Sequence, residues 1–448
     1  MSGFSPLPHV DADTIVAAAT PPGRGGIGIV RISGPATQTI AVTMLAKLPA
    51  PRHATTAAFS DAGGSTIDTG LALFFPGPHS YTGEDVLELQ GHGGPTVMDL
   101  LIARAIGLGA RQARPGEFTE RAFLNDKLDL AQAEAIADLI DAGSVEAARA
   151  AERTLAGEFS REVTALATQI MELRVFVEAA IDFPDEDVEF LESPGVRGRL
   201  FDIAGRFERI GRAAKQGRAL SEGLTVVIAG RPNAGKSSLL NTLAGHDAAI
   251  VTDIPGTTRD VLRERIHIDG LPIHVIDTAG LRDSPDRIEE EGMRRARAEM
   301  HRADLVLYLV DASIGAAPGE LELVAKNPPV LIVWNKSDLA APPRDYTGIS
   351  ISALTGAGLP DLRERLKAVA GYRAGDAGVY SARRRHLNAL ARAEGFVQSA
   401  QARLTERTGF ELVAEELRLA QQALGEITGE VTNEALLGAI FAGFCIGK

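Results

Sequence analysis

The chain has 448 residues, and because one domain usually takes about 150 residues we expect several domains. Hydrophobic residues make up 45% of the sequence and charged residues 23%, a balance that excludes an intrinsically disordered protein. The formal net charge of −13 excludes a protein that coats nucleic acid nonspecifically, since such binding needs a broad Lys and Arg surface. If the chain handles RNA, a local patch or a partner must do so.

Cysteine usage and hydropathy narrow the class further. The single cysteine, Cys445, cannot form an intramolecular disulfide, and it makes no zinc-type spacing with the nine histidines. No stretch approaches the roughly 18 apolar residues of a membrane helix, so we expect no membrane association. The apolar run from Ile15 to Ala19 is too short for a signal-peptide core, and no Lys or Arg precedes Arg24. We therefore expect a cytoplasmic protein.

The first part of the chain, residues 1–124, is rich in Gly and Pro and carries short β-like runs that turn residues separate. Two of these runs extend from Ile27 to Ile32 and from Val86 to Leu89. This pattern predicts a compact α+β domain at the start of the chain.

From about Lys127 onward, Ala, Glu, Leu and Arg dominate the sequence. Steps of three and four residues separate an apolar series that predicts one long amphipathic helix, namely Val163, Leu166, Ile170, Leu173 and Val177. The helical pattern ends near Glu222 and returns at about Ala382, with a second apolar stripe at Val413, Leu417, Ala420 and Leu424. Strands and helices alternate in between. We expect an α/β domain, residues 224–371, inserted into an all-α helical domain made of residues 125–223 and 372–448.

The inserted segment begins with a phosphate-binding loop in its required strand–loop–helix setting. A buried-strand pattern from Leu224 to Ala229 leads into Gly230 to Ser237, and a helical pattern follows from Ser238 to Leu243. The glycines let backbone N–H groups surround phosphate oxygens, and the helix N-terminus adds its dipole. Lys236 would neutralise the β and γ phosphates, and Ser237 would ligate Mg²⁺. Taken alone, the motif could still be an ordinary glycine-containing turn.

Three further motifs follow in the order that guanine-nucleotide hydrolases use, each at the end of a predicted strand. Asp277 to Gly280 supplies an Asp for the Mg²⁺ environment and a Gly whose N–H can sense the γ phosphate. Asn335 to Asp338 supplies a carboxylate that accepts hydrogens from guanine N1 and N2, whereas adenine would leave it unpaired. Ser352 to Leu354 matches the loop that contacts guanine O6 through a backbone N–H. The motifs together predict a P-loop GTPase domain.

The segment from Thr252 to Asp260 is polar and turn-rich, and we expect it to be the switch loop, with Thr258 closing on Mg²⁺. The pair Asp269 and Gly270 between two alternating runs predicts a hairpin shortly afterwards. Leu281 stands where Ras-type GTPases carry a Gln that orients the attacking water, and Leu cannot do so. The nearest carboxylates are Glu289, Glu290 and Glu291, which could equally be an ordinary charged helix start.

Several motifs resemble those of one family, the tRNA-modification GTPases called MnmE or TrmE. The similarity extends over nearly the whole chain and rests on the G motifs and on Gly23 to Gly34, Tyr81 to Asp85, Gly91 to Gly94, Arg114 to Lys127 and Phe444 to Lys448. The resemblance implies an N-terminal folate-binding and dimerising domain, a helical domain and the inserted G domain. It also implies a homodimer that works with the FAD-dependent partner MnmG, in a heterotetramer or larger assembly.

The resemblance further implies the reaction: a carboxymethylaminomethyl-type group is installed at C5 of the wobble uridine of certain tRNAs. The one-carbon unit would come from 5-formyl-tetrahydrofolate or a related folate. GTP hydrolysis in this family is stimulated by K⁺, which replaces an arginine finger, and is coupled to dimerisation of the G domains. A monovalent cation beside the phosphates can offset developing negative charge in this way.

The resemblance carries over to individual residues. K⁺ would be held by Asn233, Thr252, Ile254 and Thr257, and Glu289 would position the attacking water. Folate would be bound by Arg31, Glu88, Lys127 and Lys448. Cys445 would be a functional thiol; it mimics a prenylation box, but Gly447 and Lys448 fit that signal poorly, and from the residues alone a buried or tolerated thiol is the alternative.

The predicted site is therefore large and drawn from distant segments. The GTP contacts expected from the motifs are Asn233, Ala234, Gly235, Lys236, Ser237, Ser238, Thr252, Asp253, Ile254, Pro255, Gly256, Thr257, Thr258, Asp277, Thr278, Ala279, Gly280, Asn335, Lys336, Asp338, Ser352 and Ala353. Two rival functions remain: a switch that escorts ribosomal subunits, and a folate-binding regulatory module without catalytic transfer. Loss of the wobble-uridine modification on gene deletion would separate the enzyme from the first, and a reconstituted modification assay would exclude the second.

Overall fold

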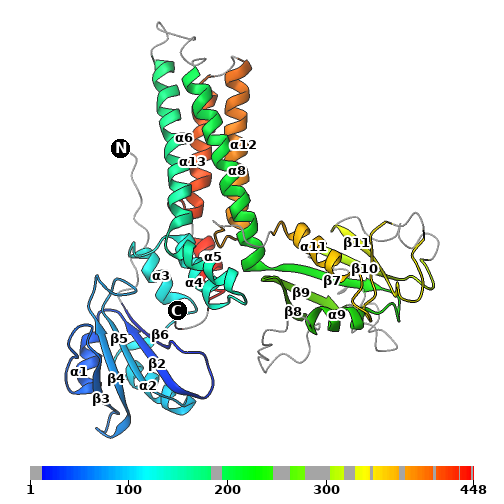
Figure 1. The fold of residues 1–448 in the computed structure, drawn as a ribbon. Helices are drawn as coiled ribbons and strands as arrows, with labels where there is room; N and C mark the ends of the chain where they lie inside the picture. The colour runs from blue at the N-terminus through cyan, green and yellow to red at the C-terminus, as the bar shows by residue number, and fades with distance from the viewer. Residues whose placement is uncertain are drawn as a thin grey trace, which may run out of the picture. The chain divides into compact units, whose positions relative to one another are not determined.

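The computed structural model describes residues 13–182, 194–245, 263–277, 303–316, 328–343, 347–372, 379–406, 410–432, 434–444 and 447. The chain divides into two compact units, Met1–Ala137 together with Gly425–Lys448, and Asp138–Leu424. The first unit is α+β, and the second combines a helical bundle with an α/β domain (Figure 1). The multidomain fold class expected from the sequence is confirmed.

The first unit contains a six-stranded sheet of order β3-β4-β5-β2-β1-β6. Its neighbouring strands are antiparallel, except that β1 and β6 are parallel. The two β-like runs of the sequence lie in β2 and β5, as predicted. The strands are β1 Thr14–Ala18, β2 Gly25–Ser33, β3 Thr55–Ser60, β4 Thr66–Phe75, β5 Val86–Gly93 and β6 Ala110–Gln112.

One face of this sheet is covered by two helices, α1 Thr37–Leu45 and α2 Pro95–Gly107. Ile40 of α1 and Leu101 of α2 are fully buried in one cluster with Val30 of the sheet. Side chains alternate across a strand, and Arg31 directly faces Glu88 in the β2–β5 pairing. Arg31 and Glu88 therefore lie on the face opposite this core.

The end of the chain folds with the first unit. Three helices complete it, α3 Glu117–Leu124, α4 Leu130–Ile140 and α14 Glu434–Phe441. Leu130 and Ala133 pack with Leu437, Phe441 and Phe444 in a separate buried cluster. Helical periodicity is a local signal, so it could not separate residues 425–448 from the helical residues before them.

A buried arginine holds the first unit together. Arg121 is 2% exposed, and its guanidinium donates to Asp13 Oδ1 at 2.7 Å, Glu84 Oε1 at 3.0 Å and Glu117 Oε1 at 3.1 Å. Arg111 also binds Glu117, at 2.8 Å. A buried charge is tolerated only when it is paired, so these residues depend on one another. The residues that the structure describes contain no group of three or more His, Cys, Asp or Glu arranged to hold a metal ion.

The second unit contains a bundle of long helices (Figure 1). The predicted apolar stripe of residues 163 to 177 is confirmed, since all five of its side chains are at most 1% exposed in one continuous helix. The second stripe, from Val413 to Leu424, is likewise fully buried. The helices are α5 Val145–Leu155, α6 Glu158–Asp182, α8 Pro194–Glu222, α12 Arg384–Glu406 and α13 Phe410–Thr428. In the parts of the chain that are described, no helix has the length and apolar character needed to cross a membrane.

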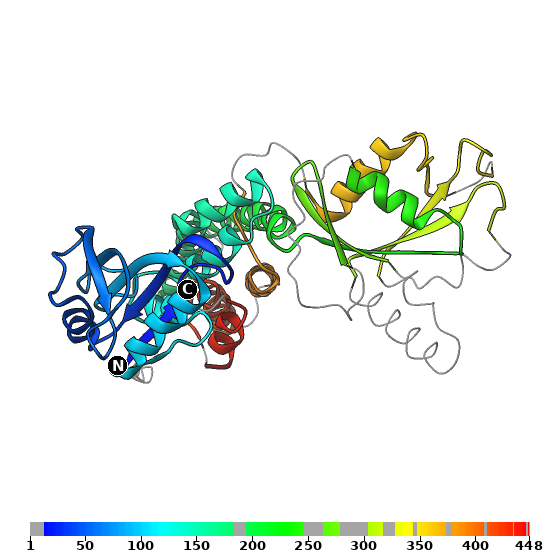
Figure 2. The same ribbon diagram turned by 90° about the horizontal axis from the view of Figure 1, so that it is seen from below.

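The α/β domain contains a sheet of order β12-β11-β10-β7-β9-β8, in which only β8 runs antiparallel to its neighbour. Residues of α9 and α11 are buried against one face of this sheet (Figure 2). Parallel strands place the loops that follow them at one edge, where ligands bind in such folds. The elements are β7 Leu224–Gly230, α9 Lys236–Gly245, β8 Arg263–Ile268, β9 Leu271–Asp277, β10 Leu305–Asp311, β11 Val330–Asn335, β12 Ile349–Ser350 and α11 Leu359–Ala370.

The hairpin predicted at Asp269 and Gly270 is confirmed. Ile268 pairs with Leu271, and the two turn residues have φ of 50° and 88°, as a tight hairpin turn with two left-handed residues requires. The turn is anchored, because Lys367 Nζ lies 2.6 Å from Asp269 Oδ2. This ion pair ties the tip of the hairpin to α11.

The arginine network predicts an acid-sensitive first unit. Burial raises the pKa of Glu117, but hydrogen bonds from Arg111, the Arg114 backbone and Arg121 outweigh it and lower that pKa to about 2. A carboxyl with a depressed folded pKa contributes stability above its unfolded pKa of about 4.3 and loses it as the pH falls from there towards 2. We expect the protection of α3 amides against hydrogen exchange in the full chain to fall between about pH 4 and pH 2, and Glu117→Gln to flatten this dependence.

The matched control is Glu120→Gln on the same helix. Burial raises the pKa of the Glu120 carboxyl, so the protonated form is the one that the folded state favours. Its contribution to the stability of the fold is therefore present at low pH and is lost as the pH rises. This variant should keep the loss of protection at low pH. An unchanged pH dependence in Glu117→Gln would contradict the assigned role of the network.

Candidate nucleotide-binding site

The loop between β7 and α9 turns sharply, as the phosphate-binding motif requires. Gly230 and Gly235 have φ of 140° and 94°, and the non-glycine residue Asn233 has φ of 63°. A Cβ on Gly230 would lie 2.4 Å from the Leu309 oxygen, and one on Gly235 would lie 2.2 Å from Asn335 Nδ2. Both positions therefore exclude any larger residue. The turn directs the chain into α9, whose N-terminus favours an anion.

Lys236, the first residue of α9, lies across this loop. Its ammonium donates to the carbonyl oxygens of Gly230 at 3.2 Å and Arg231 at 3.0 Å, and the residue is only 9% exposed. Lys236 therefore adds a positive charge at the loop where the sequence predicts phosphate binding. Ser237 and Ser238, which follow in the first turn of α9, are exposed.

Asn335 links the phosphate loop to the predicted base-binding loop. Its amide nitrogen donates to the Ala234 oxygen at 2.8 Å, and its amide oxygen accepts from the Ala353 backbone at 3.0 Å. The residue is 2% exposed, so both ends of the amide are satisfied inside the protein. Asn335 is therefore a positioning residue, because its side chain binds two loops at once.

Asp311 is a site residue that the sequence analysis missed. It ends β10 directly opposite Asn335 of β11, and its Oδ2 accepts from Lys336 Nζ at 2.6 Å. Burial raises its pKa, but hydrogen bonds from Lys336 and from the side chain and backbone of Ser313 outweigh it and lower the pKa. The ionised carboxylate therefore holds the Lys336 side chain, while the Lys336 backbone is left-handed with φ of 65°. The one indication in the sequence was a charged residue, Asp311, at the end of a strand that is otherwise hydrophobic.

Asp338 and Ser352 meet although fourteen positions separate them along the chain. Ser352 Oγ donates to Asp338 Oδ1 at 2.5 Å and accepts from the Thr355 backbone at 3.1 Å. The Ser337 backbone donates to the Ile351 oxygen at 3.0 Å, which fixes the two loops side by side. The Asp338 residue is exposed, so its carboxylate remains open to a ligand at this edge of the sheet.

The structure thus brings three of the predicted motifs to one edge of the sheet, through Asn233 to Ser238, Asn335 to Asp338, and Ser352 with Ala353. Asp277 ends β9 as expected. The other predicted GTP, Mg²⁺, K⁺ and water-positioning residues lie outside the described residues, namely Thr252, Asp253, Ile254, Pro255, Gly256, Thr257, Thr258, Thr278, Ala279, Gly280 and Glu289.

In the first unit, the structure joins two of the four predicted folate residues. Arg31 Nε donates to Glu88 Oε1 at 3.0 Å, and its guanidinium carbon lies 5.3 Å from the centre of the Tyr81 ring. Lys127 instead donates to the Pro78 oxygen at 3.0 Å. Cys445 and Lys448 lie outside the described residues. An ion pair beside an aromatic ring offers a donor, an acceptor and a stacking surface to a planar ligand.

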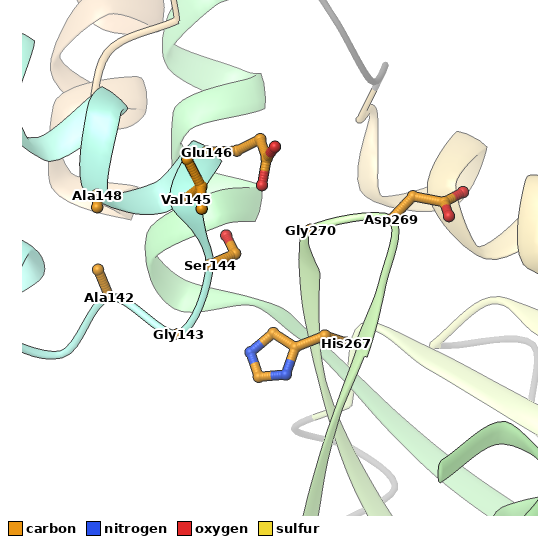
Figure 3. A pocket seen from close by; sticks show the side chains of 9 residues that line it. All are labelled: Ala142, Gly143, Ser144, Val145, Glu146, Ala148, His267, Asp269 and Gly270. Carbon is orange, nitrogen blue, oxygen red and sulfur yellow. The ribbon is translucent and has the colours of Figure 1, made fainter. Parts of the chain in front are cut away.

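A cavity of about 590 Å³ lies away from these residues, between the β8–β9 turn and the start of α5 (Figure 3). Ser144, Glu146 and Asp269 are among the residues that line it. A Cβ on Gly270 would lie 2.6 Å from Glu146 Oε2, so the turn and the helix approach each other closely. The strand β9 ends at Asp277, at the start of the predicted γ-phosphate motif. The hairpin therefore connects the nucleotide edge to α5.

Comparison with known proteins identifies the family. Residues 14–127 match the family described as GTP-binding protein TrmE N-terminus, and residues 130–445 match the MnmE helical domain. The tRNA modification GTPase MnmE of Chromohalobacter salexigens is 58% identical over 452 residues, which cover 97% of this chain and 98% of that protein. The same-named protein of Proteus mirabilis is 54% identical over 450 residues, 97% of this chain and 99% of that one.

One solved structure, the G domain of the T. maritima FeoB iron transporter, is 26% identical and covers 33% of this chain and 98% of that one, with a TM-score of 0.25. The family assignment rests on the two full-length relatives and on the two family matches. The chain belongs to the MnmE family of tRNA modification GTPases.

Proposed function

We propose that this GTPase works with the FAD-dependent partner MnmG to install a carboxymethylaminomethyl-type group at C5 of the wobble uridine of certain tRNAs, with a folate as the one-carbon donor. Family membership supports the link between GTP hydrolysis and tRNA modification. We assign folate binding and dimerisation to residues 1–124 and GTP binding to residues 224–371. We assign the helical domain to residues 125–223 and 372–448, of which residues 425–448 pack with the first unit.

The observation that best supports this proposal is the position of the end of the chain. Gly447 is buried against β1, and a Cβ on it would lie 1.9 Å from the Ala18 oxygen. Ala17 precedes Ala18 in β1 and pairs with Arg31 of β2, which forms the ion pair with Glu88. Close approach of the tail to this strand supports a shared site for Arg31, Glu88, Lys127, Lys448 and the Cys445 thiol.

In that site the ion pair would bind the ligand through its two partners. The Glu88 carboxylate suits the hydrogen-bond donors of a pterin edge, while Arg31, Lys127 and Lys448 suit the carboxylates of the glutamate tail. The folate, 5-formyl-tetrahydrofolate or a related form, supplies the one-carbon unit when bound. Binding would have to compete with the Arg31–Glu88 pair, whose side chains are 21% and 15% exposed and hence partly screened by solvent.

We propose that Asp338 selects guanine and that Asn335 aligns the loops around it. Ser352 orients the Asp338 carboxylate, and Lys236 with the exposed Ser237 lies where triphosphate and Mg²⁺ would bind. Mg²⁺ would be held by Ser237 and Thr258 and would offset the negative charge of the phosphates. Glu289 would orient the attacking water in place of the Gln that Leu281 replaces.

A K⁺ ion held by Asn233, Thr252, Ile254 and Thr257 would supply the positive charge that an arginine finger supplies elsewhere. The exposed, left-handed position of Asn233 within the loop supports this assignment. The K⁺ site would be complete only when the switch segment closes, and this closure would couple GTP hydrolysis to the pairing of two G domains. We propose a cytoplasmic homodimer that joins MnmG in a heterotetramer or larger assembly.

The cation assignment predicts a salt-specific rate. GTP turnover at equal ionic strength should rise on the order of tenfold or more when K⁺ replaces Na⁺, because the ion offsets charge in the transition state. Asn233→Ala should remove most of that response, whereas Asn241→Ala, an exposed Asn on α9, should keep it. Steady-state phosphate release in both salts measures the effect. Equal rates in K⁺ and Na⁺ for the unaltered chain would contradict the assignment.

The tail assignment predicts a separation of activities. Gly447 has φ of 98°, so Gly447→Ala combines backbone strain with the clash at Ala18 and should displace the tail. In a modification assay reconstituted with MnmG and tRNA, this variant should lose most of the product but keep its GTPase rate. Cys445→Ser should do the same without altering the backbone.

Gly443→Ala is the matched control. Among the residues that the structure places, a Cβ on Gly443 would have one neighbour within 4 Å, the Ile440 oxygen at 3.6 Å, so the variant should modify tRNA normally. Full modification by both Gly447→Ala and Cys445→Ser would refute a role for the tail. Normal modification by Cys445→Ser alone would make the thiol dispensable while leaving the position of the tail important.

A further inference from the structure

The long helices of the second unit differ sharply in charge. α8 carries seven basic and three acidic residues, and α12, packed along it, carries four Arg and two Glu. By contrast, α13 has four Glu and one Arg, and α6 is also acidic. Figure 1 shows α8 and α12 as neighbours in the bundle. A strongly basic helix in a chain of net charge −13 points to an anionic partner.

Five of the seven basic residues of α8 are exposed. Its apolar stripe is buried, with Leu200, Ile203, Phe207, Ile210 and Ala214 at most 4% exposed, so the rotation of the helix is fixed. These five cations are Arg197, Arg199, Arg209, Arg212 and Lys215. Arg199 is one turn from Ile203 and flanks the buried stripe, whereas the other four lie on the solvent side together with the exposed Asp202 and Glu208. We call these five residues the α8 basic face. From Arg197 to Lys215 it extends about 27 Å at the rise of an α-helix.

Within the part of the chain that the structure describes, these cations are only weakly engaged. The side chains of the Arg212–Glu208 ion pair are 67% and 70% exposed, and an exposed pair of this kind contributes little. The guanidinium carbon of Arg199 lies 5.4 Å from the centre of the Phe176 ring, a contact that leaves its N–H donors available. Arg218, in contrast, is partly buried and pairs with two carboxylates, so we leave it outside the face. The α8 basic face can therefore bind a polyanion without breaking a buried interaction.

Three glycines leave parts of the α8 surface without side chains. Counting described residues alone, nothing lies within 4 Å of a Cβ added to Gly198 or Gly211, and Arg209 Nη1, at 3.8 Å, is the one atom near a Cβ added to Gly205. A Gly in the interior of an exposed helix costs about 1 kcal/mol relative to Ala, and packing does not require it at these positions. A phosphodiester backbone could approach the helix axis closely here, which a larger side chain would prevent.

An aromatic ring stands in the same face. Phe201 is 79% exposed, and on a helix it lies next to positions three and four residues away, which are the glycines 198 and 205. A single exposed apolar side chain is common on protein surfaces, so Phe201 gains its significance from the cations around it. Aromatic rings among cations are typical of surfaces that stack an unpaired base while Arg and Lys bind the backbone.

We propose that the α8 basic face binds the sugar–phosphate backbone of the tRNA, with Phe201 stacking on an unpaired base. The inference rests on the proposed function, which supplies tRNA as the substrate, and it names the surface that an otherwise acidic chain uses for it. RNA is favoured over an acidic protein because low glycine positions, spaced cations and one open ring fit a backbone with exposed bases. The face lies on a helix that continues into β7 and hence into the phosphate loop.

The test compares three variants of the full chain with an unmodified tRNA transcript as the probe. One variant is Arg209→Gln with Arg212→Gln and Lys215→Gln, and the second is Phe201→Ala. The charge-matched control is Arg161→Gln with Arg418→Gln and Lys47→Gln, all of them exposed and none of them on α8. Fluorescence anisotropy titrations at KCl from about 50 to 200 mM give affinity and its salt dependence.

Removing one phosphate-binding cation should reduce the slope of log K against log salt by about 0.7 to 0.9. The triple α8 variant should therefore bind about tenfold or more weakly, with a slope shallower by about 2. Phe201→Ala should weaken binding and keep the slope, because stacking releases no counterions. The control should match the unaltered chain, and GTP hydrolysis and the thermal midpoint should be unchanged in all variants.

The inference is overturned if the triple α8 variant binds tRNA with unaltered affinity and slope, or if the unaltered chain shows no salt-dependent binding. It is also overturned if the triple variant keeps tRNA binding but loses its complex with MnmG, since the face would then bind a protein. The proposed function is tested separately by the modification assay with the unaltered chain. Normal modification there, with tRNA binding insensitive to α8, would reject the surface and leave the function intact.

Discussion

The nucleotide site depends on one buried amide, that of Asn335. It joins the phosphate loop at Ala234 to the loop at Ala353, which lie far apart in the chain and come from strands on either side of β10. Its nitrogen also fills the space that a side chain at Gly235 would need. Leaving either loop without this partner would cost about 1 to 3 kcal/mol and free the loops to move independently. The loops predicted to bind the phosphates and the base are therefore held together by a single side chain.

The local parts of this arrangement could be predicted from the sequence. The turn at Asp269, the buried stripe of α6 and the strand before Gly230 follow from patterns within a few residues, and the structure bears them out. The role of Asn335 and the participation of Asp311 could not be predicted. Both depend on the register of parallel strands, which places Asp311 opposite Asn335. Periodicity also gave no sign that residues 425–448 fold with the start of the chain.

Two elements join the sheet of the α/β domain to the helices of the second unit. The β8–β9 hairpin connects the edge of the sheet to its anchored turn beside Glu146 of α5, and α8 continues directly into β7. Buried residues of α5 and α8, such as Ala150 and Leu220, belong to the same core as the sheet. The sheet that carries the phosphate loop and the helix that carries the exposed cations therefore share one buried core.

The most direct measurement of the central claim, that Asp338 selects guanine in a pocket aligned by Asn335, is calorimetric titration of Asp338→Asn with GDP and with xanthosine diphosphate. The exchange of carboxylate for amide reverses one hydrogen bond to the base edge. The unaltered chain should bind GDP and not the xanthine nucleotide, and the variant should bind GDP at least about a hundredfold more weakly while gaining xanthosine diphosphate. Unchanged GDP affinity in the variant, or no heat when the unaltered chain meets GDP, would contradict the account.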